Sequence, residues 1–301
     1  MTNQITKKNI NCNNCGSESL KLHTKTKCSW SNLDLNIVIC TNCNLVFSHP
    51  KPNKSLGLKY FDDAYSNAPG FENHSYYRDH KNIFIRNKNR FELVKRSNPP
   101  NSNILDFGSG QGHFLKVCGD NNWNAVGIEL SRAAIDVGKK LFNVNILDST
   151  ENLPKNHFGV ITLWDVIEHL QNPKETLLML ETFLHEDGIL IFETSNIDSY
   201  DYLIKKRKWS YWDVDHYYYY SHRTLSYLLN SLGFEIINVT IEDKKGRSSF
   251  KQKVSRIIRI FLDVKEYWRK SKYVYYLISK KGYSKNSLMT VVAKKTNTNT
   301  V

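Results

Sequence analysis

The sequence predicts an α/β protein in which helices cover both faces of a mostly parallel sheet, with a small zinc ribbon at the N-terminus. From residue 103 onward, short apolar segments alternate with amphipathic ones, as in chains built from β-α-β units. Two Cys-x-x-Cys pairs lie within the first 43 residues. With 301 residues, the chain can bury an α/β core and still carry a small accessory module.

The predicted ribbon rests on two cysteine pairs, Cys12 with Cys15 and Cys40 with Cys43. Two intervening residues let both sulfurs of a tight turn reach one tetrahedral ion, and two such turns complete a four-thiolate Zn²⁺ site. Twenty-four residues separate the pairs, enough for a hairpin. The metal would be structural, because four thiolates leave no open position. The alternative, a disulfide framework, fits poorly with a polar start that does not resemble a secretory signal.

We expect three regions along the chain. Residues 1–50 form the zinc-binding module, and the prolines of "HPKP" mark its end. Residues 51–102 form a helical linker or cap, which begins as an aromatic and basic stretch, gains helical spacing, and is stopped by two prolines. Residues 103–301 form the large domain, interrupted by a basic helical insertion at 243–285.

Within the large domain, strands are expected at "NILDF", "NAVGIEL", "VNIL", "FGVITLW" and "GILIFET". Helices are expected between them at "HFLKVCGDNN", "SRAAIDVGKKL" and "NPKETLLMLETFL". After Tyr200 an aromatic, charged insertion leads to the helix "SHRTLSYLLNSLG" and the strand "FEIINVTI". The last strand, "SLMTVVAKK", follows the basic segment.

Positive charge is concentrated in one place. The formal net charge is +13, and residues 243–285 contain 14 Lys or Arg against three acids, a net of +11. Residues 250–270 have the pattern of an amphipathic basic helix, which would suit peripheral contact with a membrane. The alternative, which we favour, is a helical insertion that packs on the core or covers the active-site cleft.

The stretch "ILDFGSGQGHFL" places a glycine-rich turn between a strand and a helix. Such a turn lets a ligand approach the backbone at the carboxyl edge of a parallel sheet. Asp106 precedes the turn, and Glu129 ends the next strand, where its two oxygens suit the two hydroxyls of a ribose. A dinucleotide site would have a glycine where His113 stands, and no acid facing its phosphates. The turn therefore favours a nucleoside without phosphate.

These motifs resemble those of class I S-adenosylmethionine-dependent methyltransferases. "ILDFGSGQGHFL", "VGIELS", "FGVITLWDVIEHLQNP" and "EDGILIFETSN" follow the family's order over about 190 residues. The resemblance implies a Rossmann-like sheet of seven strands, with the turn beside the methionine part of the cofactor, Glu129 at the ribose and the end of the third strand at the adenine. The cofactor-binding residues that it implies are Asp106, Gly108, Ser109, Gly110, Gly112, Glu129, Asp148, Ser149 and Trp164.

Methyl transfer needs an acceptor aligned with the sulfonium, and a hydroxyl or enolisable carbon also needs a base. The segment "LWDVIEHL" lacks the Asn-Pro-Pro-Tyr motif of family members that methylate amide or adenine nitrogens. His216, beside Asp215, is the candidate base, since neutral imidazole accepts a proton near pH 7. The alternative is a histidine packed among tyrosines. For Glu168 and His169 we expect packing at a helix start rather than a place in the cleft.

The cysteine module followed by this core is similar to zinc-containing methyltransferases of bacterial sugar and surface-polysaccharide pathways. Among these, nucleotide-sugar C-methyltransferases carry an acid–His pair before a Tyr-Phe-Ser segment, which "DHYYYYS" resembles. The resemblance implies that Asp215 and His216 are the catalytic pair. Their long third domain is missing from this chain, so O-methylation of a sugar-related hydroxyl is supported at least as well as C-methylation.

We therefore expect a small-molecule or glycan acceptor and action in the cytoplasm, at the inner membrane surface if residues 250–270 bind there. A nucleic-acid methyltransferase is one alternative, which the confinement of charge to one segment and the absence of RNA-binding signatures disfavour. A non-catalytic cofactor-binding protein is another. The intact glycine turn, Asp106 and Glu129 argue against it.

Overall fold

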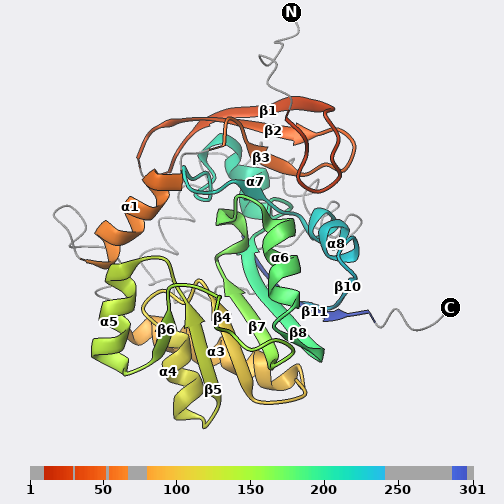
Figure 1. Ribbon diagram of the computed structural model, residues 1–301. Coiled ribbons are helices and arrows are strands. Elements are labelled where there is room, and N and C mark those ends of the chain that lie inside the picture. Colours follow the sequence, from red (N-terminus) through yellow and green to blue (C-terminus); the bar gives the residue numbers. More distant parts are fainter. Residues whose placement is uncertain (1–9, 30, 52–53, 67–79, 241–286, 297–301) are drawn as a thin grey trace, which may run out of the picture.

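The computed structural model describes residues 10–29, 31–51, 54–66, 80–240 and 287–296 (Figure 1). The described residues form a four-stranded sheet of order β1-β2-β3-β9 and a seven-stranded sheet of order β10-β11-β8-β7-β4-β5-β6. The smaller sheet lies over one end of the larger one (Figure 1). The predicted α/β architecture of seven strands is confirmed.

The small sheet is antiparallel. Strand β1 (Leu20–Lys27) pairs with β2 (Asp34–Cys40), which is the hairpin expected between the cysteine pairs. Strand β2 pairs with β3 (Val46–Ser48), and β3 pairs with β9 (Tyr218–Tyr219). Strand β9 comes from the aromatic run of the large domain. The three-region division stays a prediction, and β9 joins its first and third regions in one sheet.

The large sheet is parallel at its centre. Strands β4 (Asn103–Phe107), β5 (Asn124–Ile128), β6 (Asn145–Leu147), β7 (Phe158–Trp164) and β8 (Leu184–Ser195) pair in parallel. Strand β11 (Leu288–Lys295) runs antiparallel between β8 and β10 (Phe234–Thr240). All seven residues of β7 are buried, because both faces of the sheet are covered.

Helices cover both faces as predicted. On one face α3 (His80–Arg96) and α4 (His113–Asp120) bury Phe91, Val94, Phe114 and Val117 against the sheet. On the other, α6 (Pro173–Glu181) and α8 (His222–Asn230) bury Leu177, Leu180, Leu225 and Leu228. Helix α5 (Arg132–Phe142) connects β5 and β6. The 3-10 turn η1 (Ile167–His169) follows β7.

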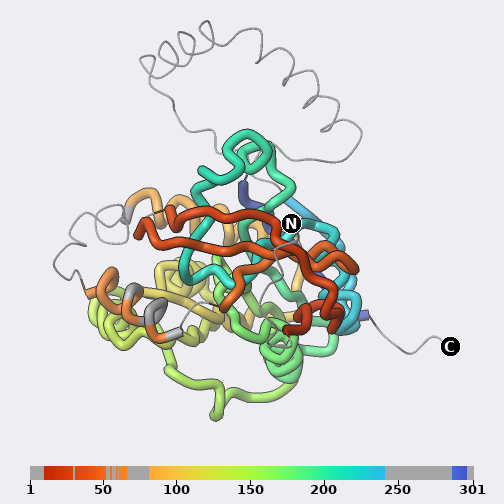
Figure 2. Tube along the Cα trace, turned by 90° about the horizontal axis from the view of Figure 1, so that it is seen from above, coloured from red at the N-terminus to blue at the C-terminus, as the bar shows by residue number. Residues whose placement is uncertain are grey.

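Two further helical segments lie near the small sheet. Helix α1 (Lys54–Tyr65) follows β3, while α7 (Tyr200–Lys205) and the 3-10 turn η2 (Lys206–Lys208) follow β8. From above, the β1–β2 hairpin crosses the molecule with the segment after β8 beside it (Figure 2). His23 contacts the Tyr202 hydroxyl at 2.6 Å and Thr26 donates to the Arg207 carbonyl at 2.6 Å.

The predicted basic insertion at 243–285 and the membrane-contacting helix at 250–270 lie outside the described residues. Strands β10 and β11 flank this segment. Within the described ranges, no helix combines the length and apolar character needed to cross a membrane.

Candidate active site and metal centre

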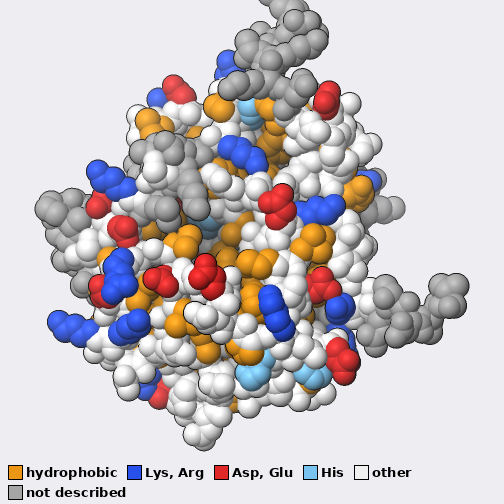
Figure 3. All heavy atoms as spheres, viewed as in Figure 1, with side chains coloured by type: hydrophobic (Ala, Val, Ile, Leu, Met, Phe, Trp, Pro, Cys, Tyr) orange, Lys and Arg blue, Asp and Glu red, His pale blue; other side chains and the backbone are white. Residues whose placement is uncertain are grey.

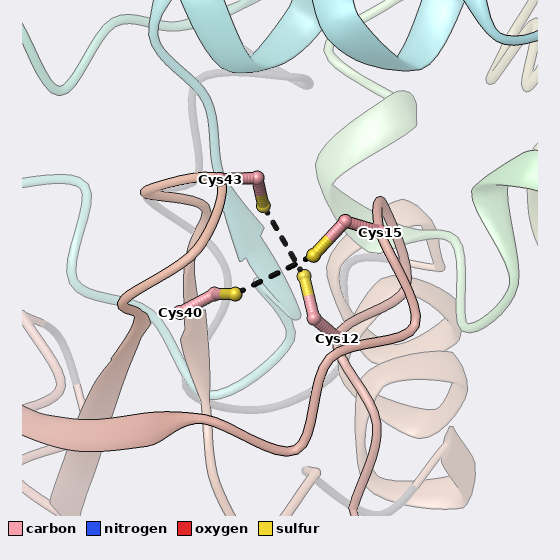
Figure 4. Close-up of side chains that lie close together, drawn as sticks. All are labelled: Cys12, Cys15, Cys40 and Cys43. Carbon is pink, nitrogen blue, oxygen red and sulfur yellow. Dashed lines mark hydrogen bonds between the residues drawn. The ribbon is translucent and has the colours of Figure 1, made fainter.

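The two cysteine pairs meet at one point (Figure 4). The sulfurs of Cys12 and Cys43 are 3.4 Å apart, those of Cys15 and Cys40 are 3.6 Å apart, and all four lie within 4.8 Å of one another. None forms a disulfide. A tetrahedral Zn²⁺ with Zn–S bonds of about 2.3 Å holds its sulfurs about 3.8 Å apart. The four thiols therefore fit a structural zinc ion.

Both turns are built alike. Gly16 N–H donates to the Cys12 carbonyl at 2.8 Å, and Asn44 N–H donates to the Cys40 carbonyl at 2.9 Å. Gly16 (φ +72°) and Asn44 (φ +66°) each follow the second cysteine of a pair in the left-handed region. Glycine and asparagine adopt this conformation most readily. The residue after each cysteine pair is therefore a second sequence feature that indicates two similar metal-binding turns.

The thiols differ in acidity. Burial raises the pKa of Cys12 above its usual range and that of Cys43 to about 11. At Cys15 burial is outweighed by hydrogen bonds from the Asn42 side chain and the Ser17 backbone, which lower the pKa to about 7. A metal ion has to displace protons from the first two, so we expect its affinity to fall as the pH falls.

The glycine turn follows β4, and its backbone admits only glycine at two positions. Gly108 has φ +78° and Gly112 φ +76°. A Cβ at Gly108 would lie 2.5 Å from Val166 Cγ2, and one at Gly112 would lie 2.7 Å from Val144 Cγ2. Gly110, between them, has φ +53°. The turn thus brings the chain back tightly at the carboxyl edge of the sheet, where a ligand can reach its backbone.

Glu129 holds this turn. Its Oε2 accepts a hydrogen bond from Gly110 N–H, and its Oε1 accepts one each from the N–H groups of Leu130 and Ser131, all at 2.8 Å. Burial raises its pKa, and these three bonds oppose that rise. A carboxylate has about four acceptor positions, so one position remains for a ligand hydroxyl.

Asp106 lies beneath the turn. It is 2% exposed, and its Oδ1 accepts a hydrogen bond from the Thr162 hydroxyl at 2.7 Å. Burial raises its pKa to about 7, although Thr162 and Arg90 oppose the rise. The Ser109 hydroxyl, next to Gly108, is buried and has no hydrogen-bond partner among the described residues. The structure thus brings Asp106, Ser109, the glycines and Glu129 together.

The other predicted cofactor residues divide into two groups. Asp148 and Ser149 are exposed just after β6, and Glu129 N–H donates to the carbonyl of Leu147 at 3.0 Å. They therefore share the edge that carries Glu129. The ring of Trp164 lies in the core, 5.4 Å from the ring of Phe114 and beneath the Arg90 guanidinium. Its ring contacts are therefore with the core and with α3, and the placement of Trp164 at the cofactor stays a prediction.

Helix α1 spans both sides of the site. The Tyr65 hydroxyl lies 3.0 Å from the position of a Cβ on Gly110. The Ser131 hydroxyl donates to Asp62, and the ring of Phe61 stands edge-on to His169 at 5.6 Å. One helix of the predicted linker or cap region therefore reaches from the glycine turn to the imidazoles.

The two imidazoles differ from the predicted acid–His pair. His216 Nδ1 donates to the Tyr211 carbonyl at 2.9 Å, which leaves Nε2 as an acceptor. Asp215 pairs with His169 instead: His169 Nδ1 is 3.1 Å from the Asp215 carbonyl and 3.4 Å from its Oδ2. No hydrogen bond joins the Asp215 carboxylate to His216 among the described residues, although an oxygen of Asp215 and a ring nitrogen of His216 lie within 4.8 Å of each other. The two rings meet edge to face at 4.6 Å.

Their protonation states also differ. Burial, followed by the neighbouring His169, lowers the pKa of His216 to about 4. Burial alone would lower the pKa of His169, but the carboxylates of Asp215 and Glu168 raise it above its usual value. Burial also raises the pKa of Glu168 to about 7, and Glu168 accepts a hydrogen bond from the Thr194 hydroxyl at 2.9 Å. Glu168 and His169, expected at a helix start, therefore lie beside the candidate base.

A charged cluster without a sequence signal lies nearby. Arg86 and Arg90 of α3 reach Asp165, after β7, at 2.8 and 2.9 Å. Both also pair with the buried Glu193 of β8, Arg90 at 2.6 Å. Although burial alone would raise it, the two guanidinium groups hold the pKa of Asp165 below its usual range. The cluster pins α3 to the carboxyl ends of two central strands.

The comparisons agree with this architecture. Residues 76–239 match the family model described as a methyltransferase domain. A protein of Methanocaldococcus jannaschii without an assigned function is 27% identical over 167 residues, which cover 54% of this chain and 61% of that protein. A ubiquinone biosynthesis O-methyltransferase of Actinobacillus pleuropneumoniae is 27% identical over 106 residues, 31% of this chain and 45% of the relative. The chain thus matches about half the length of these relatives.

Solved structures share the fold. A SAM-dependent methyltransferase of Archaeoglobus fulgidus superposes with a TM-score of 0.52 at 18% identity, covering 75% of this chain and 99% of that one. The magnesium protoporphyrin IX methyltransferase of Synechocystis PCC 6803 with bound SAH gives 0.52 at 12% identity, covering 81% of this chain and 100% of that one.

Since the family model covers more than half of the chain, the protein belongs to the methyltransferase domain family. Its seven-stranded sheet has the fold of class I S-adenosylmethionine-dependent methyltransferases, as its motifs predicted.

Proposed function

We propose that this chain transfers a methyl group from S-adenosylmethionine to a hydroxyl or carbon of a sugar-related metabolite, another small molecule or a glycan. One observation supports an acceptor whose proton is removed by a base. His216 is anchored through Nδ1 on the Tyr211 carbonyl, and its Nε2 is left to accept a proton. The helix α1 that covers the glycine turn also reaches this imidazole pair.

In this proposal the residues divide the work. Bound S-adenosylmethionine supplies an electrophilic methyl group. The glycine turn and Ser109 form the cradle at the methionine end, Glu129 accepts from a ribose hydroxyl, and Asp148 and Ser149 lie where the adenine would end. His216 Nε2 takes the proton of the acceptor as the new bond forms. Burial of this imidazole limits competing water.

We also propose that the four cysteines hold a structural Zn²⁺. Its effect reaches the active site through the small sheet. Ser48, at the end of β3, donates its hydroxyl to the His216 carbonyl at 3.0 Å and its N–H to the Tyr217 carbonyl at 2.9 Å. The metal-bound turns therefore position the segment that carries the base.

The resemblance to sugar and surface-polysaccharide enzymes motivates the acceptor class, together with action in the cytoplasm. The nucleic-acid alternative receives no support from the face in Figure 3, where Lys and Arg side chains are interspersed with Asp and Glu. Membrane contact through 250–270 stays a proposal, since that segment lies outside the described residues.

The test is transfer of labelled methyl from S-adenosylmethionine to a panel of nucleotide sugars, lipid-linked glycans and RNA. We expect label in one of the first two classes and none in RNA. His216→Ala should lower the transfer by roughly 10²–10⁴-fold, whereas His222→Ala, at an exposed histidine, should leave it intact. Label in RNA alone would overturn the proposed acceptor. Cofactor binding without transfer to any member of the panel would favour a non-catalytic binding protein.

A further inference from the structure

The proposed function uses His216 but gives no role to the paired His169 and Asp215. The His169 ring lies 4.6 Å from that of His216. The side chain of His169 is 21% exposed, whereas His216 is 8% exposed. A ring nitrogen of each imidazole and an oxygen of Glu168 all lie within 4.8 Å of one another. One bridging water can span such a separation.

Resting on the proposed function, we propose that His169 acts through His216 as a proton relay, receiving the acceptor's proton from His216 and passing it to solvent while Asp215 holds its ring. In this role Asp215 is a positioning residue for His169. The acid of the "DH" segment thereby acts on His169, whose Nδ1 it contacts through its carbonyl and its carboxylate.

The acceptor's O–H or C–H bond breaks, its electron pair forms the bond to the methyl carbon, and the sulfur keeps the pair of the broken S–C bond. The proton moves to Nε2 of His216, whose Nδ1–H stays on the Tyr211 carbonyl. It then passes, directly or through one water, to Nε2 of His169, whose Nδ1–H stays on Asp215. Loss of that proton to water restores both neutral rings.

The surrounding charges set the direction of the relay. His216 faces His169, Asp213, Asp165 and the Tyr211 carbonyl, and oxygens of Glu168 and Asp215 also lie within 4.8 Å of its ring nitrogens. Burial dominates, so its protonated form is disfavoured. His169 faces Asp215, Glu168, Asp213 and Asp165, and these carboxylates favour its protonated form. Helix α1 contributes the uncharged ring of Phe61. A proton on His216 therefore moves downhill to His169.

The first experiment titrates the histidine rings of the full-length protein by NMR. We expect the pKa of His169 to lie above the ordinary imidazole value and His216 to stay neutral down to about pH 5. Asp215→Asn should lower the pKa of His169. His169→Gln should raise that of His216, because the neighbouring cation is gone. Equal, ordinary pKa values for both rings would overturn the relay.

The second experiment follows turnover against pH with the acceptor found in the panel. Since His169 must be neutral to accept a proton, the native rate should rise with pH through the raised pKa of His169. Asp215→Asn should move this limb to lower pH. His169→Gln should reduce turnover at pH 7 by about 10- to 100-fold and shift the rising part of the pH profile to lower pH. Added imidazole should restore part of the lost rate.

Unchanged cofactor affinity and thermal stability in His169→Asn and His169→Gln exclude misfolding as the cause. If both variants keep the native rate and limb while His216→Ala is inactive, the relay fails and the proposed function stands. If native protein methylates no acceptor, the proposed function itself fails. A second equivalent of bound metal that is lost in His169→Gln would also overturn the relay, because the ring nitrogens would then be ligands.

Discussion

At the scale of single residues, Glu129 has a larger role than the sequence pattern indicated. It binds the amide of Gly110 in the turn and two amides at the start of α5, besides its proposed ribose contact. Glu129→Ala should therefore weaken S-adenosylmethionine binding by about 1–3 kcal/mol. Calorimetry measures this, with Glu235→Ala on the exposed edge of β10 as the control. Unchanged affinity would remove Glu129 from the site.

The buried carboxyl of Asp106 makes the stability of the fold depend on pH. Its pKa rises from 3.8 to about 7 on burial, so the folded state favours the protonated form. Such a carboxyl makes folding less favourable as the pH rises from about 4 to about 7. Asp106→Asn removes this cost, and its stabilising effect should grow over that range to roughly 1–3 kcal/mol. Melting temperatures at pH 5 and pH 7.5 test it: an equal difference at both would contradict the assigned acidity.

His216 is the residue on which catalysis is proposed to depend. His216→Ala should lower turnover by roughly 10²–10⁴-fold and leave cofactor affinity intact, since the residue lies outside the glycine turn. Burial, followed by the neighbouring His169, lowers the pKa of His216, while Asp215 pairs with His169. Near-native turnover in this variant would assign His216 to packing.

At the scale of helices and strands, the sequence predicted what local patterns encode. The apolar runs of β4 and β7 and the glycine turn are continuous signals, and the cysteine pairs define their turns within four residues. The two-residue strand β9 has no periodicity to detect. The pairing of His169 with Asp215 joins positions 46 residues apart, and contacts over such separations depend on the folded chain rather than on a local pattern.

The Arg cluster is the long-range element contact with the clearest energetic consequence. Arg90 of α3 pairs with Glu193, which is only 3% exposed in the interior of β8. Arg90→Met should destabilise the protein by about 1–3 kcal/mol, because the buried Glu193 then keeps only Arg86 and the Thr290 hydroxyl as partners. Adding Glu193→Gln should restore part of the loss. Urea unfolding measures both, with Lys88→Met on the exposed face of α3 as the control. Additive losses would show that the two residues are not coupled.

At the scale of the whole molecule, the metal module and the active site share one sheet. Strand β3 follows directly after the Cys43 turn, and it pairs with β9, whose segment begins just after His216. The zinc module would therefore act on catalysis at a distance, although its four thiolates take no part in the chemistry.

The purified protein should contain one Zn²⁺ per chain, and Cys40→Ser should release it. Because β9 belongs to the small sheet, loss of the metal should reduce amide protection both in β1–β3 and in residues 211–220. Strands β4 to β7 have their own core and should stay protected. Turnover should fall while cofactor affinity is retained.

Hydrogen exchange and elemental analysis measure these outcomes, with Cys28→Ser as the control because Cys28 is buried outside the metal cluster. Loss of protection confined to residues 10–50 would show that the module folds independently of the active site. Absence of zinc, or disulfides among the four cysteines, would overturn the metal site itself. Protection lost in both segments together, with β4 to β7 unchanged, would instead make the bound ion a structural requirement for the placement of His216.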